Sequence, residues 1–183
     1  MATKLSVPFA RSYWVIPERF LAGYYLGSRE PTKTRAKCRA LLEHGIRHIV
    51  NLMEEHERNF KGEPFVPYEA QLSRVAREMN LQIELVRMPI RDRDVPPVQG
   101  MTNILDEIDQ AINRGRGVYV HCWGGRGRTG TVVGCYMVRH AVAGRETALD
   151  LLARLRRDDP ISHLPSPETR TQAKLVSSWS RGQ

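Results

Sequence analysis

The stretch that decides the fold is Gly117-Val118-Tyr119-Val120-His121-Cys122-Trp123-Gly124-Gly125-Arg126-Gly127-Arg128-Thr129-Gly130. Its first part is rich in β-branched and aromatic residues, which is typical of a buried strand. A glycine-rich turn follows, and the apolar residues after Thr129 recur with helical spacing. The stretch therefore predicts a strand, a tight loop and a helix N-terminus, with a thiol where the strand ends.

The residues around this stretch alternate between strand-like and helical patterns. Runs of Val, Ile, Leu and Tyr predict strands over 13–16, 20–24, 46–52, 81–88 and 117–122. Amphipathic spacing predicts helices after Pro31, over 68–79, after Pro96-Pro97, and over 129–141, 145–157 and 168–179. Such alternation favours crossover connections. We therefore predict an α/β fold whose mainly parallel central sheet is flanked by helices on both faces.

The chain has 183 residues, which suits one domain with a full core, so we expect a single domain over 1–183. Hydrophobic residues make up 41% and charged residues 26%, which excludes a largely disordered chain. Residues 53–67 carry many charges without a clear period. We expect them to form a surface insertion.

The cysteines and the hydropathy of the sequence indicate in which cellular compartment the protein is expected. The cysteines, Cys38, Cys122 and Cys135, are an odd count of three without a Cys-x-x-Cys pair, so we expect free thiols and no structural zinc site. No stretch approaches the roughly 18 apolar residues of a membrane span, and the first ten residues lack the apolar centre of a signal peptide. We therefore expect a cytoplasmic protein.

The net charge of +8 is compatible with two interpretations. It favours a polyanionic partner or substrate, or it reflects an ordinary solvated face. No dense block of Lys and Arg with interleaved aromatic residues indicates a nucleic-acid surface. A nucleic-acid partner is therefore not predicted, although it is not excluded.

The loop after Cys122 is suited to hold a tetrahedral oxyanion. Successive backbone N–H groups of a glycine-rich loop can aim at one point, and the helix N-terminus adds a positive dipole. The same environment, with arginines nearby, favours the thiolate form of a cysteine. Arg128 can return to this cradle and bind two phosphate oxygens as a fork.

Three other interpretations of the loop are a dinucleotide-binding site, a nucleotide-binding Walker loop and a purely structural turn. Gly125-x-Gly127-x-x-Gly130 fits a dinucleotide-binding fingerprint, but no strand follows, and Asp150, at the expected distance for the acidic residue, lies in a helical pattern. A Walker loop would need a Lys-Ser/Thr ending. A buried structural thiol with turn glycines would leave the two arginines of the loop unexplained.

The residues His121-Cys122-x-x-Gly125-x-x-Arg128-Thr129 resemble the His-Cys-x-x-Gly-x-x-Arg-Ser/Thr signature of the cysteine-based protein tyrosine phosphatase superfamily. The motif lies at a strand-to-helix junction, where the family has it. The chain length and the helical C-terminal third are similar to the compact dual-specificity branch. The resemblance implies a protein tyrosine phosphatase-like fold and a phosphatase that works through a phosphocysteine intermediate.

The resemblance also implies an acid-bearing loop upstream of the cysteine. Residues 88–96 follow a strand and precede a helix, as the family's Trp-Pro-Asp-type loop does, although the Trp-Pro pair is absent. Asp92 is the best match to the general acid and Asp94 the second. The alternative is structural, with Asp94 capping a turn and both carboxylates paired with Arg91 and Arg93.

The remaining roles follow from the resemblance. Cys122 would attack phosphorus, and His121 would brace the loop. The hydroxyl of Thr129 would hydrogen-bond the thiolate, or else cap the helix. Arg126 would add a second cation for substrates with several phosphates, or form a salt bridge. The phosphate oxygens would be bound by the side chain of Arg128 and by the loop backbone: Trp123, Gly124, Gly125, Arg126, Gly127 and Arg128.

The expected activity is hydrolysis of phosphotyrosine, phosphoserine or phosphothreonine in proteins, without a metal or another cofactor. A phosphatase of inositol phosphates, phosphoinositides or RNA 5′ phosphates is the alternative, and a phospho-ligand binding module is a further one. Phosphate, vanadate or sulfate is expected to bind in the loop.

Overall fold

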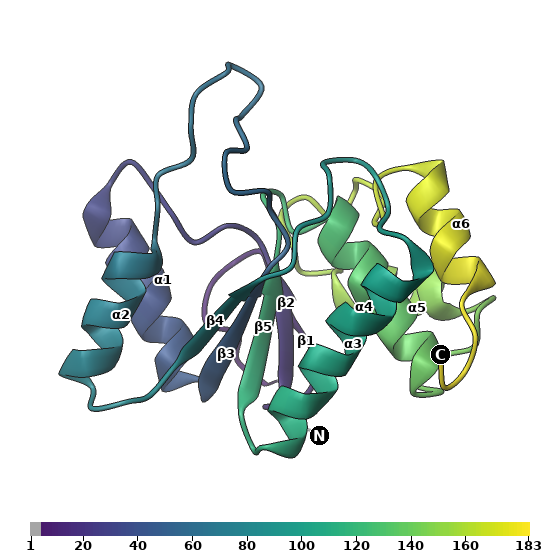
Figure 1. Cartoon of the computed structure of the whole chain (residues 1–183), viewed down its shortest axis with the longest axis horizontal. Coiled ribbons are helices and arrows are strands. Elements are labelled where there is room, and N and C mark those ends of the chain that lie inside the picture. The colour runs from purple at the N-terminus through teal and green to yellow at the C-terminus, as the bar shows by residue number, and fades with distance from the viewer. Residues whose placement is uncertain (1–4) are drawn as a thin grey trace.

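The computed structural model describes residues 5–183 and has one five-stranded sheet at its centre (Figure 1). The order across the sheet is β1-β2-β5-β3-β4. β1 is antiparallel to β2, and all the other neighbours are parallel. The strands are β1 Ser12–Ile16, β2 Phe20–Gly23, β3 Ile46–Asn51, β4 Glu84–Arg87 and β5 Gly117–His121.

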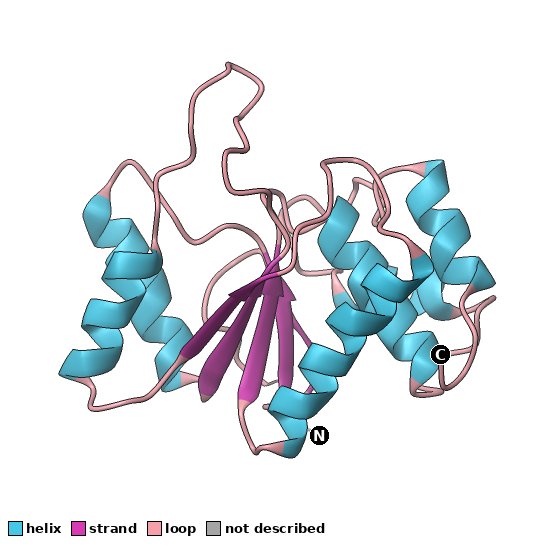
Figure 2. Cartoon of the chain, in the orientation of Figure 1, coloured by secondary structure: helices cyan, strands magenta, loops and turns pink. Residues whose placement is uncertain are grey.

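Helices cover both faces of the sheet (Figure 2). One face carries α1 Pro31–Glu43 and α2 Glu69–Glu78. The other carries α3 Val98–Asn113, α4 Gly127–Arg139, α5 Ala148–Leu155 and α6 Arg170–Ser178. This confirms the predicted α/β fold with a mainly parallel sheet flanked on both faces.

The element boundaries differ from the sequence prediction in a few places. The strand predicted over 81–88 is shorter, because β4 is an edge strand that pairs with β3 alone. α4 begins at Gly127, two residues earlier than predicted, because the glycine-rich turn already takes helical geometry there. α1 ends as predicted before Gly45, whose φ of +82° is readily adopted by glycine.

The core places β5 and α4 at the centre of the molecule. All five residues of β5 are buried, and α4 is buried over most of its length, since it packs against β2, β5 and the other helices of its face. The Cβ of an alanine at Gly134 would lie 2.7 Å from Val176, so this glycine lets α4 and α6 approach closely. The loop between β5 and α4 is therefore held between two rigid elements.

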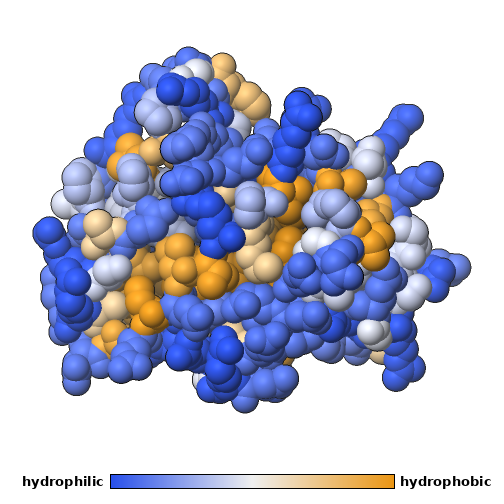
Figure 3. All heavy atoms as spheres, viewed as in Figure 1, coloured by the Kyte–Doolittle hydropathy of each residue, from blue (hydrophilic) through white to orange (hydrophobic). Residues whose placement is uncertain are grey.

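The molecular surface is uneven in hydropathy. The face seen in Figure 1 is mostly hydrophilic, and apolar side chains gather in a band across its middle (Figure 3). None of the helices within residues 5–183 combines the length and the apolar composition needed to cross a membrane.

Candidate active site

The loop between β5 and α4 forms the floor of a pocket at the carboxyl end of the central strand. Cys122 follows β5 directly and is buried, with 3% of its surface exposed. It lines a pocket of about 230 Å³ together with Asp92 and Arg128. Ligand sites in open α/β sheets lie at this end of the strands. Three residues predicted from the sequence for one reaction therefore lie around one cavity.

Polar contacts with surrounding residues hold the backbone carbonyl groups of this loop. The Cys122 carbonyl faces Nδ1 of His121 at 3.2 Å, and the Trp123 carbonyl accepts a hydrogen bond from the backbone N–H of Tyr25 at 3.0 Å. The Gly124 carbonyl accepts one from Nη2 of Arg11 at 2.7 Å. Because the C=O and N–H of a peptide group point in opposite directions, these contacts turn the following N–H groups toward the inside of the loop.

Two further features fix the loop. The carbonyl of Arg126 accepts a hydrogen bond from the hydroxyl of Ser166 at 2.8 Å. Gly125 has a φ of +66°, and a Cβ there would lie 2.6 Å from the backbone of Gly23. Only glycine fits this position, because both the conformation and the close approach exclude a side chain. Arg11 and Ser166 come from distant parts of the chain, and no sequence motif indicates that they contact this loop.

Arg128 is a buried cation held by a bidentate ion pair. Its two Nη atoms lie 2.6 and 2.8 Å from the carboxylate oxygens of Glu57, and Nη1 also donates to the carbonyl of Ile90 at 3.1 Å. Nη2 lies 3.0 Å from Asp92. Burial opposes the charge, but the hydrogen bonds to Glu57 and the attraction of Cys122, Glu57 and Asp92 outweigh it and raise the pKa of Arg128.

Glu57 corrects the expectation that residues 53–67 form only a surface insertion. These residues do form the long loop that rises above the sheet in Figure 1, with a single isolated bridge between Arg58 and Pro64. The side chain of Glu57, however, is only 8% exposed and reaches Arg128. The loop follows β3, which lies beside β5, so it begins at the same edge of the sheet as Cys122. No pattern within residues 53–67 singles out Glu57 itself.

The structure separates the two candidate acids. Asp92 lines the pocket with Cys122, and its side chain is 39% exposed. Asp94 accepts a hydrogen bond from the N–H of Val95 at 2.8 Å, which is the turn-capping arrangement considered as the alternative. Nε of Arg93 lies 3.9 Å from a carboxylate oxygen of Glu168, so this arginine pairs with Glu168 and not with Asp92 or Asp94.

His121 is buried and lies in a chain of polar contacts behind the loop. Its Nε2 lies 2.7 Å from the hydroxyl of Tyr68, and Nδ1 faces the Cys122 carbonyl. Burial lowers the pKa of His121 to about 3, although the contact with the Cys122 carbonyl opposes this. The ring is therefore neutral at pH 7, with Nδ1–H donating and Nε2 accepting from Tyr68, which agrees with a bracing role.

Two further side chains of the loop are Thr129 and Arg126, and only Arg126 takes one of the roles considered for it. The hydroxyl of Thr129 is buried without a hydrogen-bond partner among residues 5–183, so the hydrogen bond to the Cys122 sulfur is not formed here. Thr129 does not cap α4 either, since the N-cap is Arg126. Nη2 of Arg126 forms an ion pair with Glu168 at 2.6 Å, which is the salt-bridge alternative.

The other two cysteines lie in the core. Cys38 on α1 and Cys135 on α4 are buried free thiols. Burial raises the pKa of Cys38 to about 12 and also raises that of Cys135. Neither lines the pocket of Cys122.

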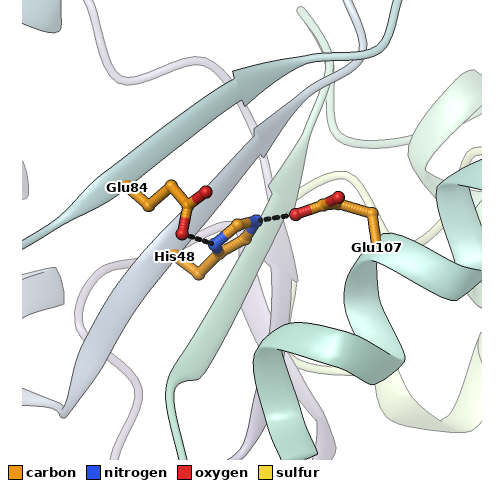
Figure 4. A group of neighbouring side chains, drawn as sticks. All are labelled: His48, Glu84 and Glu107. Atoms are coloured by element: carbon orange, nitrogen blue, oxygen red, sulfur yellow. Dashed lines mark ion pairs between the residues drawn. The ribbon is translucent and has the colours of Figure 1, made fainter. Parts of the chain in front are cut away.

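One group of side chains within residues 5–183 is close enough to hold a metal ion (Figure 4). None of its members lines the pocket of Cys122. The Nδ1 of His48 lies 3.4 Å from Glu84, and its Nε2 lies 3.0 Å from Glu107. Arg114 lies 3.6 and 3.9 Å from the same carboxylates, and Arg116 also pairs with Glu84. The positive charges of the two arginines offset the negative charges of the two carboxylates. The cluster therefore links β3, β4 and α3 through ion pairs.

A family model described as a polymorphic toxin system DSP-PTPase phosphatase matches residues 26–142. The chain belongs to this family. The match contains the loop between β5 and α4, residues 88–96 and Glu57, and it confirms the resemblance based on the motif around Cys122.

Individual relatives extend the similarity beyond that segment. The mouse dual specificity protein phosphatase CDC14B is 28% identical over 173 residues, which cover 92% of this chain and 32% of that protein. The rat phosphatidylglycerophosphatase and protein-tyrosine phosphatase 1 is 26% identical over 122 residues, 64% of this chain and 56% of that protein. The matched segments cover 38% and 32% of the first two curated relatives, so the chain spans about a third of their length.

Solved structures share the fold. Kinase associated phosphatase superposes with a TM-score of 0.66 at 16% identity, covering 94% of each chain. The active form of Tk-PTP gives a TM-score of 0.63 at 20% identity, covering 91% of this chain and 93% of that one. PTPMT1 in complex with PI(5)P gives 0.64 at 17% identity, covering 91% and 92%.

Proposed function

We propose that this protein is a cysteine-dependent phosphatase that hydrolyses phosphate monoesters in two steps. The observation that carries the proposal is the pocket lined by Cys122, Arg128 and Asp92, above a loop whose carbonyls are held outward. A nucleophile, a cation and a carboxylate around one cavity are the parts that transfer of a phosphoryl group requires.

In the first step the Cys122 thiolate attacks phosphorus, and the bond to the leaving oxygen breaks. The inward N–H groups and Arg128 stabilise the charge that develops on the phosphoryl oxygens. Asp92 donates its proton to the leaving oxygen and then, as a carboxylate, accepts a proton from the water that hydrolyses the phosphocysteine. Thr129, whose buried hydroxyl has no hydrogen-bond partner in the described part of the chain, can donate to the sulfur as it leaves.

The proposed substrate is a phosphorylated protein. Relatives support both protein and lipid substrates: one is named a dual specificity protein phosphatase, and one a phosphatidylglycerophosphatase and protein-tyrosine phosphatase. TpbA from P. aeruginosa, a solved structure in complex with pTyr, shares the fold with a TM-score of 0.64 at 14% identity. Non-protein polyanions remain the second candidate.

We also propose a cytoplasmic location and a single catalytic domain over 1–183. The buried free thiols of Cys38, Cys122 and Cys135 support a reducing compartment. The one sheet and one core cluster within residues 5–183 support a single domain.

The decisive experiment compares Cys122→Ser with wild type on a phosphotyrosine peptide, a phosphothreonine peptide and an inositol polyphosphate. We expect Cys122→Ser to lose turnover and still bind phosphate or vanadate, because the loop and Arg128 remain. Cys135→Ala is the matched control, since this thiol lies outside the pocket, and it should keep its activity. Turnover by Cys122→Ser would show that the thiol is not the nucleophile.

A further inference from the structure

A second pocket lies between the N-terminal segment of the described chain and α5. It has a volume of about 600 Å³ and is lined by residues between 5 and 14 and between 151 and 159. We call it the N-terminal groove. It shares no lining residue with the pocket of Cys122. Its volume lies within the range of about 300 to 1,000 Å³ that is usual for small-molecule sites.

The walls of this groove are largely apolar. Its apolar lining residues are Leu5, Val7, Ala10, Trp14, Leu151 and Leu155. Leu5 and Val7 are 41% and 40% exposed. Phe60, which is more exposed still, packs on Trp123 with 4.5 Å between the ring centroids and belongs to the pocket of Cys122. The N-terminal groove is therefore a second place where exposed apolar surface lines a cavity, as it does in ligand sites.

The charges of the groove favour an anion. Its charged lining residues are Arg11, Arg154, Arg157, Asp158 and Asp159. Arg157 pairs with Asp158 at 3.7 Å. Asp159 pairs with the buried Arg156 at 3.4 Å. The side chain of Arg154 is exposed and has no hydrogen bond or ion pair within residues 5–183. The groove therefore has positive charge that no carboxylate of the described chain offsets.

Two buried donors of the groove lack an acceptor. They are the hydroxyl of Tyr13 and Nε of Arg11, and neither has a hydrogen-bond partner in the described part of the chain. Asp159 lies 3.9 Å from Nε of Arg11, which is too far for a hydrogen bond. Burial raises the pKa of Tyr13, so its hydroxyl keeps its proton. Because buried donors are almost always paired, these two suit a ligand that brings an acceptor.

Arg11 connects the groove to the loop between β5 and α4. Its Nη2 donates to the Gly124 carbonyl at 2.7 Å, whereas its Nε is the atom without an acceptor. The guanidinium is planar and rigid, so an acceptor bound at Nε also restricts the direction in which Nη2 points. A ligand in the groove would therefore help to hold the Gly124 carbonyl, and with it the N–H groups that point to the inside of the loop.

We propose that the N-terminal groove is an effector site for a small amphipathic carboxylate, and that its occupancy tightens phosphate binding through Arg11. The hydrocarbon part of the ligand would lie on the apolar walls. Its carboxylate would accept a hydrogen bond from Nε of Arg11 and be attracted by the charge of Arg154. The proposed phosphatase activity does not require this site.

Calorimetry of the wild-type protein with octanoate, hexanoate and octanamide tests the ligand class. Octanoate should bind about 15-fold more tightly than hexanoate, because each buried methylene contributes about 4-fold. Octanamide has the same chain without the charge and should bind about 2- to 5-fold more weakly than octanoate. Arg154→Ala should remove most of the difference between octanoate and octanamide. Arg74→Ala removes an exposed arginine of α2, outside the groove, and should keep this difference.

A second pair of variants tests the position of the site. Val7→Asp places a negative charge at a groove side chain that is 40% exposed, so it should weaken octanoate binding about 5-fold through like-charge repulsion. Val142→Asp adds the same charge at a side chain of 43% exposure outside the groove and should bind octanoate as the wild type does. Circular dichroism of each variant checks that the fold is retained.

Phosphate titrations with and without saturating octanoate test the coupling. We expect octanoate to tighten phosphate binding about 5-fold, at the lower end of the usual coupling between two sites, and phosphate to tighten octanoate binding by the same factor. Arg11→Ala should abolish both effects. Because these titrations measure binding, a wild-type protein that binds both ligands and hydrolyses no phosphate ester would refute the phosphatase activity and not this site.

Several results would overturn the proposal. These are an absence of octanoate binding, equal affinity for octanoate and octanamide, octanoate binding that Val7→Asp leaves unchanged, and phosphate binding that octanoate leaves unchanged or weakens. Weaker phosphate binding would place octanoate in the pocket of Cys122, where the two anions compete.

Discussion

At the scale of single residues, the guanidinium of Arg128 contacts two carboxylates in different ways. Glu57 engages both Nη atoms and is nearly buried, whereas Asp92 contacts one Nη atom and is considerably more exposed. The bidentate pair is suited to orient the guanidinium, because its fork geometry is fixed. Asp92 has the looser contact, which suits the general-acid role proposed for it, because a carboxylate held by a single contact can turn toward a leaving oxygen.

This difference allows a test of the general acid. We expect Asp92→Asn to lower turnover of an alkyl phosphate by about 10² to 10⁴, the usual contribution of a positioned acid. An activated aryl phosphate, whose leaving group needs no proton, should lose much less. Asp94→Asn should be mild with both substrates, because Asp94 caps its own turn. Steady-state kinetics with the two esters measures the effect. A leaving-group-dependent loss in Asp94→Asn instead would reassign the acid.

The depressed pKa of His121 predicts how stability depends on pH. The folded-state pKa of about 3 lies below the ordinary value of 6.5, so between these values the unfolded chain binds more protons. Stability should therefore fall as the pH drops from about 6.5 toward 3. The contribution of His121 is about 1.4 kcal/mol per pH unit, or about 2 kcal/mol at pH 5.

Urea denaturation at pH 7 and pH 5 measures this dependence. His121→Gln should show a smaller loss of unfolding free energy between the two values than wild type does. The exposed His163 provides the control, and His163→Gln should keep the wild-type dependence. Burial also lowers the pKa of His48, so part of the dependence should remain in His121→Gln. An unchanged dependence in His121→Gln would contradict a buried neutral ring.

At the scale of elements, the catalytic loop takes its shape from donors that lie outside it. Arg11 precedes β1, has a φ of +66°, and donates to the Gly124 carbonyl while its guanidinium lies 4.6 Å from the ring of Tyr24. The same side chain lies 3.9 Å from Asp159. These contacts hold its charged end under the loop.

Arg11→Ala should weaken the cradle. The Gly124 carbonyl loses a charged donor worth about 1.5–3 kcal/mol, so the following N–H is no longer directed inward. We expect phosphate to bind about 10-fold more weakly and kcat/KM to fall by a similar factor. Arg157→Ala is the matched control, because Arg157 is exposed, pairs with Asp158 and does not contact the loop. Calorimetry with phosphate and steady-state kinetics give the two readouts, and wild-type phosphate affinity in Arg11→Ala would exclude this role.

The elements themselves could be predicted from the sequence more fully than the contacts between them. Alternating strand and helix periods predicted the layers, because each period reflects which face of an element is buried. The charged residues 53–67 have no period, so Glu57 and Phe60 could not be told from an ordinary solvated loop. Their roles depend on contacts with residues far along the chain, such as Arg128, which no local pattern encodes.

At the scale of the whole molecule, the parallel strands bring the site together. Cys122, Arg128 and Asp92 could be predicted because they belong to a compact motif and to one strand-ending loop. The packing of Phe60 on Trp123 and the pairing of Arg126 with Glu168 depend on how the long loop and the segment before α6 fold over the sheet. Spacing along the chain contains no information on such packing.

The hydrogen bonds from Arg11 and Ser166 also connect the site to the order in which the chain is made. A ribosome delivers Arg11 well before the catalytic loop and Ser166 well after it. A nascent chain that has just exposed residues 117–130 therefore has only the earlier of these two braces. The loop therefore acquires both braces only after Ser166 has also emerged and packed against it.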